Sequence, residues 1–430
     1  MRIGLLAAAM LAAMSCSTGH VAEGPDPAAS DAAKAFEIAL HDGDLAALQR
    51  VAADRHRPRA ETALARAAVD CWWRQDDKAG DALSAAAHDL TLSPGLRRNA
   101  LLLLSGLRMR QSRYGEAVAA LDAALPLIGD ESERAETQGA RDLEAALVGA
   151  PPMQVAVSGQ GSAPLTRDLA GLTRGAVAIN GQTLETIIDT GSSINTISEG
   201  NARRLGLRIL PGKVSIGTAT SARASGGLAI ADTVTFAGAE FRNVAFLVLP
   251  DSALTFANGA YVVHAIVGMP ILLELGRIEY RTDGDRETLS YSRTRARPGV
   301  ESNLMVEGYE PYTFVKIEGS EQTLRLFIDN GAVTSHLNQR FVADFPAIVA
   351  DAQRQKVTRT GAAGSETQEA LKLPSLVLRV GRMTAPIKNV DVITDQKTNR
   401  HGDLGLDALR AAPGYVLDFG AMRLDLLPPN

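Results

Sequence analysis

The chain has 430 residues, of which 46% are hydrophobic and 22% charged, so it holds enough apolar material for more than one folded core. A net charge of −5 and an aromatic content of 4% argue against the basic, aromatic-lined surfaces that bind nucleic acids. We therefore expect no nucleic-acid partner.

The first residues predict an export signal. Arg2 precedes an apolar run over residues 3–14, which is too short to span a bilayer as a helix. Small residues at 13–15 suit a cleavage site. We assign residues 1–15 to a signal peptide and expect the mature protein in the cell envelope or periplasm.

Cys16 follows this segment directly. A small residue and a cysteine after an apolar run resemble the lipobox of bacterial lipoproteins, although Ala13 stands where that family usually has Leu. The resemblance implies that Cys16 is lipidated and that this lipid is the protein's only membrane attachment. Ordinary cleavage at the same bond, with Cys16 left free, is the alternative. Cys71 is the only other cysteine, so a lipidated Cys16 leaves it without an intrachain partner.

Residues 26–148 are rich in Ala and Leu at helical spacing and predict an α-helical region. Residues 100–106 and 113–118 resemble the first and second helices of a tetratricopeptide repeat, a module whose stacked helix pairs bury their apolar faces against each other. An irregular helical bundle is the alternative. Such a region could hold a protein partner.

Residues 149–152 break the helical pattern, and we expect few contacts to cross this boundary. Short runs rich in Val, Ile and Thr follow, bounded by Gly, Asn and Asp, as at 176–181 and 232–238, and they predict strands. An Arg-rich stretch at 292–298 predicts a linker. The β region is thus expected to form two lobes, residues 151–294 and 300–430.

An internal repeat runs through the β region. The segment 186–191 (TIIDTG) matches 326–331 (LFIDNG), and each is followed by a short helix-like run. Further on, 266–268 (IVG) matches 403–405 (DLG) at a nearly equal interval, and the glycine-led segments that begin at 276 and 414 match in turn. Landmarks repeated in the same order indicate a duplicated unit.

The paired Asp-x-Gly segments resemble the active-site signatures of pepsin-like and retropepsin-like aspartic peptidases, over about residues 165–430. The resemblance implies a multidomain α plus β protein, in which two all-β barrel lobes of the acid protease fold follow the helices. It also implies an aspartic endopeptidase that cleaves extended polypeptides without a cofactor. The catalytic residues would be Asp189 and Asp329, and the residues supporting their loops would be Thr190, Gly191, Ser192, Asn330, Gly331, Gly268 and Gly405.

Two carboxyls within hydrogen-bond reach cannot readily both ionise, so they share a proton and supply a base and an acid to one water molecule. The sequence contains no motif that indicates another kind of catalytic site. The seven histidines are scattered and form no HExxH motif, so no metal site is expected.

Three positions depart from the family or distinguish the two signatures. Asn330 stands where relatives have Thr or Ser, and Asp403 stands where an apolar residue is common. In relatives a hydroxyl at the position of Ser192 can donate to the neighbouring Asp, so the resemblance implies a hydrogen bond from Ser192 to Asp189. Ala332 at the matching place has no donor, so Asp189 is expected to be the more readily ionised partner. Asn330 keeps a second function open, that of a catalytically impaired envelope lipoprotein that binds peptides or scaffolds partners.

Two segments are candidates for the hairpin flaps that close the cleft in relatives. They are residues 217–221 and 360–365, both small and polar in composition.

Overall fold

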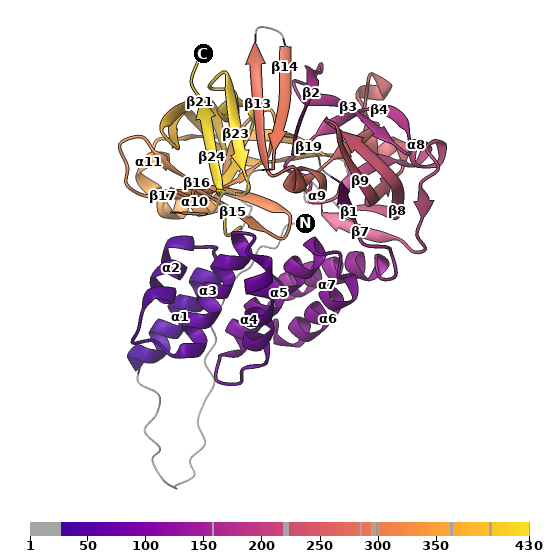
Figure 1. Cartoon of the computed structure of the whole chain (residues 1–430). Helices are drawn as coiled ribbons and strands as arrows, with labels where there is room; N and C mark the ends of the chain where they lie inside the picture. Colours follow the sequence, from indigo (N-terminus) through magenta and orange to yellow (C-terminus); the bar gives the residue numbers. More distant parts are fainter. Residues whose placement is uncertain are drawn as a thin grey trace.

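The computed structural model describes residues 27–156, 159–217, 223–283, 286–293, 298–299, 301–361, 364–394 and 398–429. The predicted signal peptide, Cys16, most of the linker at 292–298 and the centres of both predicted flaps lie outside the described residues. Within the described part, no helix is both long and apolar enough to cross a membrane. Figure 1 shows the helices of residues 27–146 gathered below the strands.

In the described residues 27–146, seven α-helices follow one another, and each packs against the next. Side-chain caps mark three helix starts: Asp44, Ser93 and Asp130 each accept a hydrogen bond from the backbone N–H three residues ahead. The predicted helical region is confirmed, while its likeness to tetratricopeptide repeats stays a prediction. The helices are α1 (Pro27–His41), α2 (Leu45–Ala53), α3 (Arg59–Trp72), α4 (Asp76–His88), α5 (Pro94–Arg110), α6 (Tyr114–Ala124) and α7 (Glu131–Ala146).

The larger sheet has fourteen strands in the described part of the chain, and short helices follow two of these strands, β5 and β12. Its strands are β1 (Gln154–Ala156), β2 (Gln160–Arg167), β3 (Thr173–Ile179), β4 (Gln182–Ile188), β5 (Asn195–Ser198), β6 (Arg208–Ile209), β7 (Val214–Gly217), β8 (Arg223–Phe236), β9 (Ala239–Leu249), β12 (Ala265–Val267), β13 (Arg277–Asp283), β14 (Arg286–Ser292), β23 (Gly414–Asp418) and β24 (Arg423–Leu427). The helices are α8 (Glu199–Arg204) and α9 (Met269–Leu272).

The smaller sheet has eight strands among the described residues. They are β15 (Leu304–Glu307), β16 (Glu310–Ile317), β17 (Thr323–Ile328), β18 (His336–Asn338), β19 (Gln353–Gly361), β20 (Gly364–Val380), β21 (Met383–Ile393) and β22 (Gly402–Leu404), with helices α10 (Gln339–Asp344), α11 (Pro346–Val349) and α12 (Leu406–Leu409). A separate hairpin pairs β10 (Thr255–Phe256) with β11 (Tyr261–Val262).

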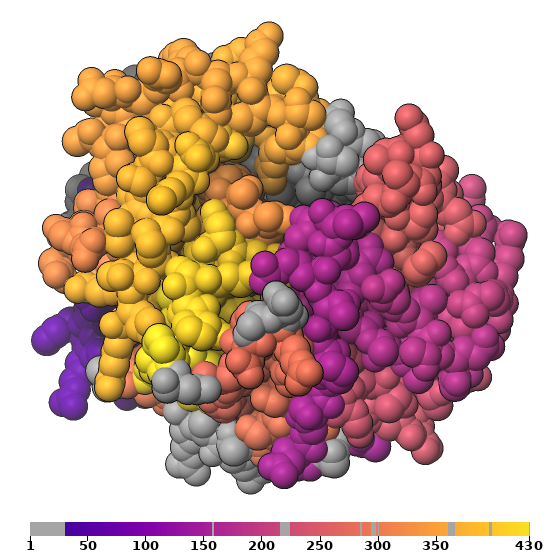
Figure 2. Space-filling view, turned by 90° about the horizontal axis from the view of Figure 1, so that it is seen from above, coloured from indigo at the N-terminus to yellow at the C-terminus, as the bar shows by residue number. Residues whose placement is uncertain are grey.

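The two sheets repeat one pairing pattern. β4 pairs in parallel with β12, as β17 does with β22, and β5 pairs in parallel with β9, as β18 does with β21. One feature was not expected: β23 and β24, which belong to the predicted second lobe, join the larger sheet through β13. The sheets therefore do not divide at residues 294–300. Figure 2 shows the magenta-to-coral and the orange-to-yellow residues side by side on the upper face.

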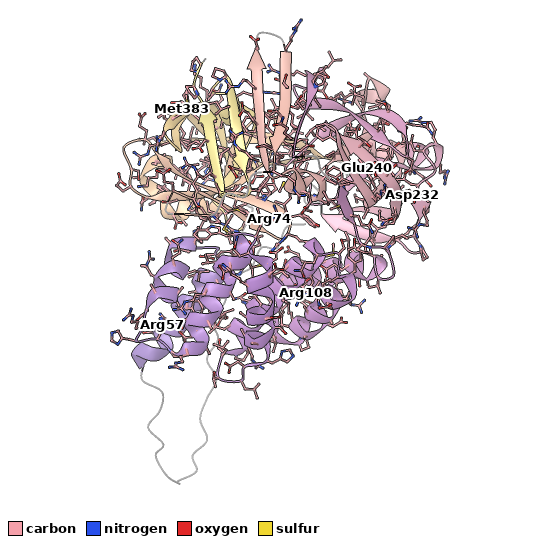
Figure 3. All side chains as sticks on the ribbon, viewed as in Figure 1. Arg57, Arg74, Arg108, Asp232, Glu240 and Met383 are labelled. Carbon is pink, nitrogen blue, oxygen red and sulfur yellow. The ribbon has the colours of Figure 1, made fainter. Side chains whose placement is uncertain are left out.

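The helices share hydrophobic cores with the sheets. Met305, Tyr312 and Phe327, from β15, β16 and β17, are buried in the same cluster as the side chains of α1 to α5. At the junction, where Figure 3 labels Arg74, its guanidinium donates to the Leu273 carbonyl oxygen at 2.9 Å and to Glu274 at 3.0 Å. The expectation of few contacts across residues 149–152 was wrong.

Candidate active site

Asp189 and Asp329 lie together although 140 residues separate them along the chain. Each follows the end of a strand, β4 or β17, and its backbone N–H donates to the parallel neighbour: Asp189 to the Val267 carbonyl at 2.9 Å, Asp329 to that of Leu404 at 3.0 Å. The side chains of the two aspartates are hydrogen-bonded to each other. The structure thus brings the two predicted catalytic residues into one site.

The residues that follow the aspartates lock the two loops together. The Thr190 N–H donates to Asn330 Oδ1 at 2.7 Å, and the Asn330 N–H donates to Thr190 Oγ1 at 3.0 Å. Thr190 Oγ1 also donates to the Ile328 carbonyl oxygen at 3.0 Å. Asn330 Nδ2 donates to the Tyr415 hydroxyl at 3.2 Å, and both Thr190 and Asn330 are fully buried. The asparagine amide therefore takes part in the hydrogen bonds that join the two loops.

Gly191 and Gly331 let the carboxyls approach. Each backbone N–H donates to the aspartate two residues before it, at 2.7 Å to Asp189 and 3.0 Å to Asp329. A Cβ atom on Gly191 would lie 2.3 Å from Asp329 Oδ1, and one on Gly331 would lie 2.4 Å from Asp189 Oδ1. No side chain fits at either place, because real Cβ contacts are not that short.

Gly268 and Gly405 support the two loops from behind. A Cβ on Gly268 would lie 2.3 Å from the Ser192 carbonyl oxygen, and one on Gly405 would lie 2.6 Å from the Thr334 carbonyl carbon. Their N–H groups are held by side chains that sequence reasoning missed: Asn195 Oδ1 accepts from Gly268 at 3.0 Å, and Ser335 Oγ accepts from Gly405 at 2.9 Å. Both partners stand six residues after an aspartate, so the internal repeat held a signal that could have found them.

Ser192 does not make the expected bond to Asp189. Its hydroxyl donates instead to the Ile194 carbonyl oxygen at 2.6 Å. The turn after Asp189 offers that carbonyl acceptor two residues ahead of Ser192, within reach of its short side chain.

The two carboxyls differ in acidity. Burial raises the pKa of Asp189 to about 6, although hydrogen bonds from Gly191, Asp329 and Gly331 oppose the rise. Burial, and then the charges of Asp189 and Asp403, raise the pKa of Asp329 well above its usual range. Asp189 is therefore the more readily ionised partner, in the expected order but for a cause other than Ser192.

Asp403 belongs to a buried charged cluster beside Asp329. Arg400 Nε lies 2.8 Å from Asp403 Oδ1, and His336 Nε2 lies 3.4 Å from Asp403 Oδ2. Asp403 is 2% exposed and pairs with Phe327, two residues before Asp329. The sequence showed Asp403 only as a departure from an apolar position, because its partner Arg400 carries no motif.

Both predicted flaps belong to hairpins in the described strands. β7 pairs with β8 up to Gly217 and Arg223, and β19 pairs with β20 up to Gly361 and Gly364. Burial lowers the pKa of Arg359 on β19, and the negative charges of Asp403 and Asp329 oppose this shift. Arg359 on the β19–β20 hairpin therefore lies within electrostatic range of Asp329.

Residues 176–271, which include Asp189 and Gly268, match the aspartyl protease family. No curated protein is significantly similar to the chain in sequence. Among solved structures, the chain is similar to a retropepsin-like aspartic protease from Rickettsia conorii, with 20% identity over 32% of this chain and 94% of that one, and a TM-score of 0.21. The family match supports an aspartic peptidase in general terms. Within the described residues, no group of His, Cys, Asp and Glu is placed to hold a metal ion.

Proposed function

We propose that the protein is an aspartic endopeptidase that hydrolyses peptide bonds with water activated between Asp189 and Asp329. The observation that carries this proposal is the hydrogen-bonded carboxyl pair, in which each aspartate also accepts the N–H of the following Asp-x-Gly glycine. A pair that shares one proton holds a base and an acid at the same water.

The inequality of the two carboxyls assigns their roles. Ionised Asp189 takes a proton from water as the water oxygen bonds to the scissile carbonyl carbon, and Asp329 gives its proton to the carbonyl oxygen. In the collapse of the resulting diol, Asp189 returns its proton to the amide nitrogen as the C–N bond breaks, and one diol proton goes back to Asp329. The pair ends with the single proton it began with.

The substrate would lie in extended form beneath the β19–β20 hairpin, since main-chain hydrogen bonds to a strand edge suit an extended peptide. Arg359, close to Asp329, would then face the substrate near the scissile bond.

The test compares Asp189→Asn and Asp329→Asn with Asp232→Asn, an exposed residue of β8, on a mixture of peptides. Each site variant should lose at least about a hundredfold in turnover, because one carboxyl cannot serve as both acid and base, and the Asp232 variant should cleave normally. Normal turnover by either site variant would refute the assignment. If the unaltered protein neither cleaves nor binds a transition-state-mimicking inhibitor, the impaired, peptide-binding lipoprotein becomes the better description.

We further propose that the protein is exported and held in the cell envelope by a lipid on Cys16. The support is the apolar run and the small residues that precede this cysteine. Mass spectrometry of the mature N-terminus decides the matter, and an unmodified Cys16 would remove the anchor.

A further inference from the structure

A cavity of about 200 Å³ lies where the helices meet the catalytic sheets. Its walls come from α5, α6 and α7 on one side, and on the other from residues 193–195, directly after the Asp189 loop, and from the turn between β15 and β16. Cavities of roughly 150 Å³ already admit benzene, so this one has room for a small ligand. It is separate from the catalytic carboxyls, which do not line it.

Glu144 on the wall of this cavity is a buried acid without a cation. It is 4% exposed, and both its carboxyl oxygens lie 3.0 Å from the hydroxyl of Ser105, which is itself 2% exposed. Among the described residues no Lys, Arg or His pairs with Glu144. Buried carboxyls are rare unless a charge or several hydrogen bonds compensate them, so this one calls for a partner.

The opposite end of the cavity also holds unpartnered polar atoms. Thr137 Oγ1 and Asn99 Nδ2, at 1% and 6% exposure, have no hydrogen-bond partner in the described part of the protein. Thr137 and Glu144 are seven residues apart on α7, or about 10 Å along the helix axis. The wall between them is apolar, formed by Leu102, Leu103 and Ala140. The cavity is thus an apolar slot with an acid at one end and neutral hydrogen-bonding groups at the other.

The other titratable groups that line the cavity supply no cationic partner to Glu144. Glu307 is paired with Arg325 at 2.7 Å, and Tyr312 donates to Glu310. The pKa of His41 is lowered, chiefly by burial, so it supplies no cation. Arg98 on α5 is held by Glu133 and Glu37. The other titratable groups on the wall are Tyr114 and Tyr309.

We propose that this cavity binds a primary ammonium group carried on an unbranched apolar chain, with the ammonium paired to Glu144. The apolar chain lies along α5 and α7, and an acceptor at its far end receives the Asn99 amide. A free alkylamine and a lysine side chain of a polypeptide both present this chemistry, and in the lysine the main-chain carbonyl supplies the acceptor.

Binding of an ammonium group should release a proton from Glu144. Burial raises the pKa of Glu144 to about 8, so the empty site holds a neutral carboxyl at pH 7. Pairing with an ammonium requires the ionised form, and binding must therefore release a proton. Affinity should rise nearly tenfold from pH 6 to pH 7, since the amine stays protonated throughout this range.

Isothermal titration calorimetry on the full chain tests the proposal by measuring the binding of n-hexylamine and n-hexanol at pH 6 and pH 7. Two buffers with different ionisation enthalpies give the number of protons released on binding. Hexylamine should bind at least tenfold more tightly than hexanol at pH 7 and should release about one proton, because only the amine pairs with Glu144. Glu144→Gln should remove both the preference and the pH dependence. Glu131→Gln, an exposed change on the same helix, should alter neither.

Equal affinity for hexylamine and hexanol, unchanged hexylamine binding in Glu144→Gln, or no hexylamine binding at millimolar concentration would overturn the proposal. Ser105→Ala serves if Glu144→Gln does not fold: losing the hydroxyl should raise the pKa of Glu144 further and weaken amine binding at pH 7. Displacement of hexylamine by N-acetyl-lysine methylamide would assign the site to polypeptide lysine, and its failure to compete would assign it to a free amine. None of these measurements depends on peptide cleavage.

Discussion

Asn330 occupies the position at which the catalytic loops grip each other, and its longer side chain reaches a residue that a threonine would not. Its Oδ1 accepts from Thr190, while its Nδ2 donates to the Tyr415 hydroxyl. Tyr415 in turn stacks on Tyr280 with ring centroids 4.5 Å apart. Asn330 therefore links the loop that follows Asp329 to β13 and β23.

Asn330→Thr should not raise turnover, because the amide already satisfies the Thr190 N–H. It should lower stability by about 1–3 kcal/mol, since the buried Tyr415 hydroxyl loses its partner. Thermal unfolding and steady-state cleavage, measured beside Tyr415→Phe, check this. If the threonine variant is both faster and at least as stable, Asn330 is only a poor substitute for a hydroxyl.

Glu144 should also contribute to the pH dependence of the free energy of unfolding. Its pKa is raised to about 8 in the folded chain. In the unfolded chain Glu144 loses its proton near its ordinary pKa of 4.5. Between this pKa and the folded-state pKa of about 8, only the folded state keeps the proton. The free energy of unfolding therefore falls as the pH rises through this range. The slope is about 1.4 kcal/mol per pH unit for one such carboxyl.

Glu144→Gln should therefore flatten the decline in unfolding free energy between pH 5 and 8 and should be the more stable chain at pH 7 and above. Urea unfolding at several pH values, without added ligand, measures it. The same decline in both chains would show that Glu144 is ionised in the folded protein.

At the scale of elements, the glycine behind each catalytic loop fixes how closely two strands and a turn can approach. Gly268→Ala would place its Cβ 2.3 Å from the Ser192 carbonyl oxygen, a backbone atom that cannot swing aside. We expect a shifted Asp189 loop, with cleavage reduced by at least about tenfold and stability lowered by about 1–3 kcal/mol. Gly115→Ala is the matched control: it lies in α6 with nothing within 4 Å of its Cβ, so it should stabilise by about 0.5–1 kcal/mol. Equal effects of the two changes would contradict this account.

Sequence patterns predicted several helices and strands well, but they did not predict how the strands pair. The strands before the aspartates and the short helices α8 and α10 could be predicted, because local periodicity and the repeat both mark them. The pairing of β23 with β13 could not be predicted, because the local sequence of a strand does not determine which strand it pairs with in the tertiary structure. Asp403 and Arg400 escaped for the same reason: their burial side by side follows from packing rather than from spacing.

At the scale of the whole molecule, the helices and the two sheets share hydrophobic cores, so that each covers apolar side chains of the other. The core around α1 to α5 includes Met305, Tyr312 and Phe327, and a second shared cluster joins Leu143 and Leu147 of the helical side to Ile187 of β4. Ile187 is two residues before Asp189, so this packing reaches the base of the catalytic loop.

A fragment of residues 151–430 should therefore be less stable than the full chain. Each large apolar side chain left without its cover costs about 1.5–3 kcal/mol, and Met305, Tyr312 and Phe327 are all uncovered at once. We expect a lower unfolding temperature, stronger binding of a hydrophobic dye and reduced cleavage, with recovery when residues 27–150 are supplied as a second chain. The full chain cut within residues 149–152 is the control, because it keeps every contact and loses only the connection. A fragment that unfolds at the temperature of the full chain and cleaves as fast would show that the helices rest on a β region complete without them.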